Sequence, residues 1–202
     1  MEKPYKLSFT AGGLLYQQTI EIAISCRGQK EPDWDAIRTQ VVSGMLLHAT
    51  RASSRTRYYL EIRRRFQSAH EFEIEWIASE QESARLALFA LCCRHYDFLG
   101  EFMEETIRHK LAIGDTILTV ADFYSFFEKK AETHGELRTI TESSRRKVQT
   151  VLFRMLAEAG IADIQTHRFS VPVVPQALVE HYRKAGDYPA LMHLLQVEGA
   201  QP

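Results

Sequence analysis

Hydrophobic positions along most of the chain recur at intervals of three and four residues, which is the pattern of amphipathic helices. Asp33, for example, is expected to cap a helix in which Trp34, Ile37 and Val41 fall on one face before Gly44 ends the segment. The breaks between such segments are short, and the sequence has no repeat of fixed period. The pattern predicts an all-α protein, a compact bundle of about seven to nine helices.

Polar residues with helix-capping chemistry mark where several of these helices begin. Thr10 is expected to cap the first helix, with an irregular first turn at Gly12 and Gly13, because glycine is costly inside a helix. Capping-box pairs predict further helix starts at Ser79 and Thr119. Residues 72–77 alternate charged and apolar side chains and fit either a short strand or another helical turn.

The character of the chain changes after Gly160. Residues 161–164 and 168–174 are rich in β-branched side chains, and residues 165–167 separate them. Prolines at 172 and 175 limit these stretches to the edge of a sheet. We expect either a small hairpin, which would be a wing, or an extended arm.

The net charge of −1 conceals an uneven distribution of charge. Residues 51–65 contain six Arg and one Glu, a net charge of +5. Residues 138–154 contain four Arg, one Lys and one Glu, a net charge of +4, so the rest of the chain carries −10. An acidic body with two concentrated basic segments is typical of a protein that binds a polyanion.

The first basic segment, residues 54–69, has the period of an amphipathic helix. Arg57 and Arg64 are placed opposite its apolar stripe, and Arg63 and Arg65 on the flanks of that stripe. Cations in a first helical turn oppose the helix dipole, whereas an anion resting there would be stabilised. The residues expected to face such an anion are Arg51, Ser53, Ser54 and Arg55. With them, Arg57, Arg63 and Arg64 are expected to contact DNA from this segment.

The second basic segment, residues 142–159, repeats this arrangement. Its cations and those of the first segment lack acidic partners four residues away, Glu61 being the main exception. The cations of both segments are mostly Arg, whose planar guanidinium group can form paired hydrogen bonds with a phosphate or with the edge of a guanine. The residues expected to contact DNA from this segment are Ser144, Arg145, Arg146, Lys147, Thr150 and Arg154.

Each basic helix follows another predicted helix and a tight connection, which is the helix-turn-helix plan. Residues 33–43 form the helix before the first basic helix, and residues 120–132 form the helix before the second. After the second basic helix, the β-prone residues beyond Gly160 occupy the position of a wing. We expect residues 1–115 to contain the first unit and residues 116–202 the second, winged unit, packed together as one compact body.

The sequence favours a binding protein over an enzyme. It lacks a glycine-rich phosphate loop, and no alternation of strands and helices provides a methyltransferase sheet. The eight His are scattered. We interpret Glu71, Glu73 and Glu75 as one acidic face and not as nuclease carboxylates. We therefore expect no catalytic residue, no metal and no cofactor.

The three cysteines, Cys26, Cys92 and Cys93, are expected to be buried thiols in a reducing compartment. No apolar run reaches the roughly 18–20 residues that a membrane span needs. The chain starts with a polar stub instead of an apolar signal region. We expect a cytoplasmic protein without a membrane partner.

Several short motifs stand out by their order and spacing. They are GGLLY at 12–16, RASS at 51–54, EIRR at 61–64, CRHY at 93–96, DF and FF at 122–123 and 126–127, SRRK at 144–147, LFRML at 152–156 and EAG at 158–160. In this combination they resemble the BrxA family, a small core component of the bacteriophage exclusion (BREX) defence systems of bacteria. The resemblance covers about residues 5–160 and fades after Gly160.

The resemblance implies an all-α protein with helix-turn-helix elements that binds double-stranded DNA. It also implies genetic partnership with a methyltransferase, an ATPase and other components of the same system, and it carries over no catalytic residue. Two other functions stay open beside duplex-DNA binding. One is an adaptor or scaffold whose basic helices dock on other defence components, and the other is an RNA-binding helical bundle.

Overall fold

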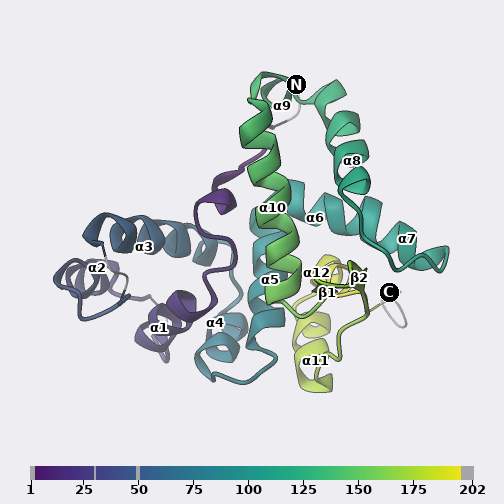
Figure 1. The fold of residues 1–202 in the computed structure, drawn as a ribbon. Helices are drawn as coiled ribbons and strands as arrows, with labels where there is room; N and C mark the ends of the chain where they lie inside the picture. The colour runs from purple at the N-terminus through teal and green to yellow at the C-terminus, as the bar shows by residue number, and fades with distance from the viewer. Residues whose placement is uncertain (1–2, 30, 49–50, 197–202) are drawn as a thin grey trace.

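The structure is a computed structural model that describes residues 3–29, 31–48 and 51–196. The described residues are mostly helical, which confirms the all-α prediction (Figure 1). The helices are shorter and more numerous than expected, because residues 97–112 divide into the three elements α6, η2 and α7, and because α9 and α12 are short. In chain order they are η1 (Ser8–Ala11), α1 (Tyr16–Cys26), α2 (Trp34–Ser43), α3 (Ala52–Phe66), α4 (Glu71–Ala78), α5 (Ala84–His95), α6 (Asp97–Phe102), η2 (Met103–Arg108), α7 (His109–Ala112), α8 (Val120–Thr133), α9 (Gly135–Thr139), α10 (Glu142–Glu158), α11 (Gln176–Lys184) and α12 (Tyr188–His193).

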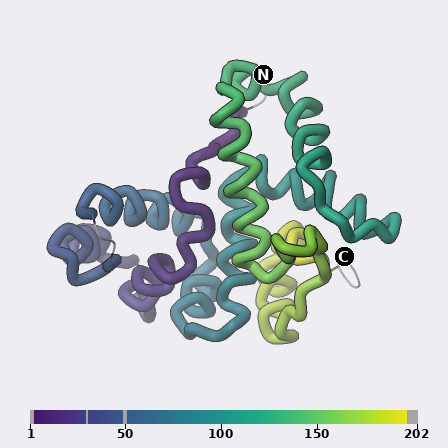
Figure 2. Tube along the Cα trace, viewed as in Figure 1, coloured from purple at the N-terminus to yellow at the C-terminus, as the bar shows by residue number. Residues whose placement is uncertain are grey.

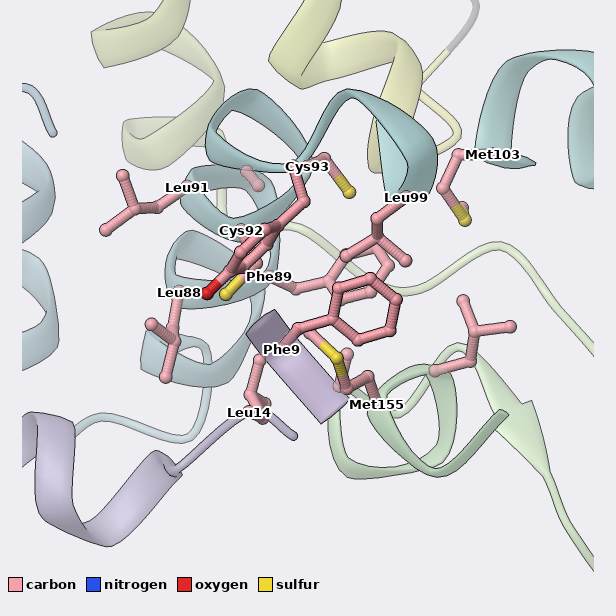
Figure 3. Packing of buried hydrophobic residues seen from close by; sticks show 14 of the residues in the cluster. Phe9, Leu14, Leu88, Phe89, Leu91, Cys92, Cys93, Leu99, Met103 and Met155 are labelled. Carbon is pink, nitrogen blue, oxygen red and sulfur yellow. The ribbon is translucent and has the colours of Figure 1, made fainter. Parts of the chain in front are cut away.

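Helix α5 lies in the core of the molecule and packs against α4, α6, α12, α3 and α10. A helix that is apolar on all sides has to be buried on all sides, and residues 86–93 are all buried. Phe89 from this helix joins Phe9 from η1 and Met155 from α10 in one cluster (Figure 3). Cys92 and Cys93 belong to the same core, and Cys26 is buried in α1, so the prediction of buried thiols is confirmed.

The first α-helix begins later than Thr10, at Tyr16, because the backbone before it leaves the helical region twice. Gly13 has φ +70° and Leu15 has φ +56°, both in the left-handed region. The irregular turn expected at the two glycines is therefore present, and it extends further than predicted. The helix start predicted at Ser79 was wrong: α5 begins at Ala84, and its N-cap is Ser83.

Residues 71–78 form helix α4, which settles the choice between strand and helix in favour of the helix. The interpretation of three glutamates as one acidic face was wrong. Glu73 is fully buried, accepts hydrogen bonds from Arg94 (2.8 and 3.0 Å) and from the Tyr182 hydroxyl (2.9 Å), and so ties α11 to the core. The same guanidinium of Arg94 also contacts Asp187, the N-cap of α12. This buried network fixes the C-terminal helices on α4 and α5.

A two-stranded antiparallel hairpin, β1 (Ala162–Asp163) and β2 (Arg168–Phe169), follows α10. Of the two alternatives for this region, the hairpin is the one observed. No helix among the described residues is long and apolar enough to cross a membrane.

Candidate nucleic-acid interface

Helices α8 and α10 and the hairpin form a continuous part of the chain with well-defined ends. The Thr119 side chain accepts from the Asp122 N–H, and Asp122 accepts from the Thr119 N–H, so the predicted capping box of α8 is confirmed. The Thr141 side chain caps α10 by accepting from the Ser144 N–H at 3.2 Å. The short helix α9 lies between them (Figure 1).

The hairpin is joined to the residues that precede α8. The Leu118 N–H donates to the His167 carbonyl at 2.7 Å, and the Phe169 N–H donates to the Thr116 carbonyl at 2.9 Å. Ile117 and Arg168 form an antiparallel bridge between these two bonds. The order is thus a bridging segment, a helix, a short helix, a long helix and a hairpin, with β1 packed beside α10.

One face of α10 presents cations and hydroxyls to solvent. The Arg146 side chain is 73% exposed and that of Arg154 is 46% exposed. Lys147 and Thr150 are exposed on the same side of the helix, and Ser144 is exposed in its first turn. Among the predicted residues of this helix, these five are accessible to a polyanion.

Arg145, by contrast, is turned inward. Its Nη1 lies 2.5 Å from Glu128 Oε1, its guanidinium lies 4.7 Å from the centre of the Phe127 ring, and its side chain is 22% exposed. Both partners belong to α8, so Arg145 joins α8 to α10 instead of projecting from the basic face.

Four predicted residues of α3 are exposed, and three others are partly covered. Those exposed are Arg51, Ser53, Arg57 and Arg64. Ser54 is half-buried, and the half-buried Arg55 donates to the carbonyls of Val41 (3.1 Å) and Val42 (3.3 Å) at the C-terminal end of α2. The guanidinium of Arg63 lies 5.6 Å from the centre of the Trp34 ring. Helix α3 and its N-cap thus present three exposed cations, the same number as α10.

The assignment of Arg65 to the flank of the stripe was wrong, because this side chain is fully buried. Its Nη1 and Nη2 donate to the carbonyls of Leu14 and Gly13, both at 2.7 Å, and its Nε donates to the Tyr96 hydroxyl at 2.9 Å. That hydroxyl in turn contacts the buried carboxylate of Glu61. The sequence did contain the signal: Arg65 follows Tyr58 by seven residues, two helical turns, which places it on the apolar face.

Burial also sets the protonation states in this network. Desolvation raises the pKa of the Tyr96 hydroxyl above its ordinary range, so the hydroxyl stays protonated and can donate to Glu61. Desolvation opposes the charge on Arg65, but contacts with Cys92, Tyr96 and Glu61 outweigh it and leave its pKa raised. Arg65 therefore stays charged, and each of its three guanidinium nitrogens donates a hydrogen bond.

The expectation that the cations lack acidic partners was also wrong in part. Arg146 lies 4.0 Å from Glu142 and Arg154 lies 3.5 Å from Glu158, each four residues away on α10. Arg64 lies 3.7 Å from Glu61. These pairs are exposed on the arginine side and long, so solvent screens them and the guanidinium groups remain able to exchange partners.

An apolar cavity of about 310 Å³ lies between α10 and the hairpin. Phe153, Leu118 and Ala162 form part of its wall, and Thr150 and Arg154 from the basic face of α10 also line it. Val120 and Ile164 lie on its wall too and are 49% and 57% exposed. Apolar surface of this kind beside a charged face is a site where a partner can dock.

The comparisons with known proteins cover nearly the whole chain. A family model described as BrxA matches residues 3–186. The chain belongs to the BrxA family. The match continues past Gly160, where the motif resemblance was expected to end, and includes the hairpin and α11.

A relative described as "BREX protein BrxA", from Bacillus cereus (strain H3081.97), is 25% identical over 190 residues, which cover 92% of this chain and 94% of that protein. The crystal structure of an uncharacterized protein from Magnetospirillum magneticum superposes with a TM-score of 0.79 at 16% identity, covering 95% of this chain and 98% of that chain. The shared fold thus includes both basic helices of this BrxA-family member.

Proposed function

We propose that the protein is a non-enzymatic, double-stranded-DNA-binding component of a BREX phage-defence system. The observation that carries this proposal is the exposed face of α10, where Arg146, Lys147, Thr150 and Arg154 lie in a row beside a hairpin. A row of cations on a helix that follows a helix and a turn is suited to DNA phosphates, with some side chains reaching base edges.

The element order supports a winged helix-turn-helix for residues 116–202, with α10 as the DNA-contacting helix and the hairpin as the wing. In residues 1–115, α2 and α3 are the corresponding pair. The proposed contact residues there are Ser53, Arg57 and Arg64 on α3 and Arg51 at its N-cap. The internal contacts of Arg55, Arg63 and Arg145 favour a structural role for these three and remove them from the proposed contact set.

The test is the affinity for a duplex of about 24 base pairs as a function of salt. If about six phosphates are neutralised, affinity should fall by about a thousandfold between about 50 and 200 mM salt. Replacing Arg146 and Lys147 together with Ala should weaken binding and reduce the salt dependence, because each lost phosphate contact lowers the slope of log K against log salt by about 0.9. A flat salt dependence contradicts the proposal.

The apolar cavity beside α10 supports one alternative, an adaptor that docks on other BREX components such as the methyltransferase or the ATPase. Charging its wall through Val120→Asp would abolish such docking and leave the cations of α10 in place. Parallel arms with single-stranded DNA, RNA and the other components of the system separate the alternatives. Preferential binding of RNA or of a protein component, with no measurable affinity for duplex DNA, decides against DNA binding.

A further inference from the structure

The N-terminal residues 8–14 run between the two basic helices. In Figures 1 and 2 this segment, drawn in purple, passes from the region of α9 down between α3 and α10. We call it the connecting segment. It contains η1 and the left-handed turn at Gly13, and η1 packs on α10.

On its α3 side, the connecting segment is held by buried polar bonds. Arg65 donates to the carbonyls of Gly13 and Leu14, both at 2.7 Å. The Ser8 hydroxyl donates to Glu61 at 2.9 Å. Arg65 and Glu61 both belong to α3, so two points of this helix are fixed to one short stretch of backbone. Away from water, charge-assisted bonds of this kind are strong.

On its α10 side, the same two residues are held again. The Leu14 N–H donates to Glu158 Oε2 at 3.2 Å. A side chain at Gly13 would meet Arg154, because an ideal Cβ there would lie 2.7 Å from its Nη2. Leu14 is thus bonded to α3 through its carbonyl and to α10 through its N–H. The Gly13 carbonyl is bonded to α3, and Arg154 of α10 occupies the space that a side chain at Gly13 would need.

From these contacts we infer that the connecting segment joins α3 and α10 into one surface that engages a single duplex with both basic helices, and that Arg65 is the positioning residue of this surface. The inference rests on the proposed function. When two binding elements are linked, the second contact with the same duplex becomes intramolecular, which raises the affinity. A fixed geometry between the two elements preserves this gain in affinity.

The dimensions of the helices are compatible with this mode. The 15 residues of α3 and the 17 of α10 span roughly 22 and 26 Å at about 1.5 Å per residue. At about 3.4 Å per base pair, a duplex of about 24 base pairs is roughly 82 Å long, whereas one of about 9 base pairs, roughly 31 Å long, is little longer than α10 alone. A duplex of about 24 base pairs can therefore contact both helices, whereas a hairpin-capped duplex of about 9 base pairs reaches one.

The experiment compares the wild type with Arg65→Lys and Glu158→Ala on both duplexes. Arg65→Lys keeps the positive charge but loses the guanidinium group that donates to two carbonyls. A change in the salt dependence of this variant therefore cannot be caused by a lost charge. Glu158→Ala removes the acceptor of the Leu14 N–H. Its matched control is Glu142→Ala, which removes the same charge and also frees an arginine of α10, but does not touch the connecting segment.

For the 24-base-pair duplex, Arg65→Lys and Glu158→Ala should lose about half of the salt slope, and Arg65→Lys should bind about 10- to 100-fold more weakly than the wild type. Affinity for the 9-base-pair duplex should stay within about twofold of the wild type for Arg65→Lys, and Glu142→Ala should keep the full slope. If Arg65→Lys does not fold, as judged by circular dichroism, Glu158→Ala alone decides, because its side chain is 36% exposed.

If Arg65→Lys and Glu158→Ala both keep the wild-type salt slope on the 24-base-pair duplex, the inference is overturned and the proposal of DNA binding is unaffected. A wild type that binds neither duplex overturns the proposed function itself. Equal weakening of Arg65→Lys on both duplexes also overturns the inference, because it indicates a general structural defect.

Discussion

Arg145 and Phe127 are stacked: the guanidinium carbon of Arg145 lies 4.7 Å from the centre of the Phe127 ring. The contact joins the first turn of α10 to α8, and the ion pair with Glu128 at 2.5 Å completes it. The next residue, Arg146, points into solvent. Two adjacent arginines therefore have different roles on the same helix.

Arg145→Ala should lower the free energy of unfolding by about 1–3 kcal/mol, because it removes a partly buried cation–π contact and a hydrogen-bonded ion pair. Arg146→Ala should change it by less than about 0.5 kcal/mol, since that side chain is exposed. Urea denaturation of both variants measures the difference. Equal losses would show that Arg145 does not join the two helices.

Arg65→Met should destabilise the protein by about 3–5 kcal/mol, because it leaves the carbonyls of Gly13 and Leu14 without their donor and removes the buried cation of the network that contains Glu61. Adding Glu61→Gln to Arg65→Met should recover part of this loss, since the two residues act in one network. Denaturation curves of the single and double variants test the coupling. Strict additivity of the two changes would speak against it.

Gly13→Ala should cost more stability than Gly114→Ala. Both glycines have positive φ, +70° and +76°, so each substitution carries about 1 kcal/mol of backbone strain. A Cβ at Gly114 meets nothing within 4 Å, whereas a Cβ at Gly13 would lie 2.7 Å from Arg154 Nη2. The excess cost at Gly13 should be about 0.5 kcal/mol, because Arg154 Nη2 is the end of a flexible, 46% exposed side chain that can shift. Equal melting temperatures for the two variants would show that Arg154 moves freely.

Stability should fall as the pH drops from about 6.5 to about 4, and His95 should be one cause. Burial, with a smaller contribution from nearby Lys6, lowers the pKa of His95 from 6.5 to about 4. Between these values the unfolded chain binds a proton that the folded chain does not, so acid favours unfolding.

His95→Asn should therefore reduce the loss of unfolding free energy between pH 7 and 4.5 by about 2 kcal/mol. The amide can still hydrogen-bond to Ser68, whose hydroxyl lies 3.1 Å from His95 Nδ1. Thermal melts of wild type and variant at both pH values test this. Parallel pH profiles would place the acid sensitivity elsewhere, for example at His193, whose pKa is also lowered by burial.

Features that depend on neighbours in the sequence could be predicted. The capping box at Thr119 and Asp122, the cap at Asp33 and the exposed face of α10 all follow from spacings of three and four residues. These features place the helices and identify the face of α10 that carries the candidate site.

Features that depend on residues far apart in the chain could not be predicted. Glu73 is buried because Arg94 and Tyr182 reach it from α5 and α11. Arg145 leaves the basic face because Phe127 and Glu128 of α8 attract it. A count of positive charges does not separate arginines that bind the protein from arginines that face solvent.

The backbone bonds that link Leu118 to His167 and Phe169 to Thr116 place the entry and the exit of residues 116–169 next to each other. Neighbouring strands lie about 4.8 Å apart, so the two ends of this segment are within reach of one short linker. A segment with adjacent ends can be spliced into a surface turn of an unrelated carrier or circularly permuted. Because α10 also packs on η1 and α5, the segment shares its core with the rest of the chain, and its adjacent ends suit only rearrangements that keep those contacts.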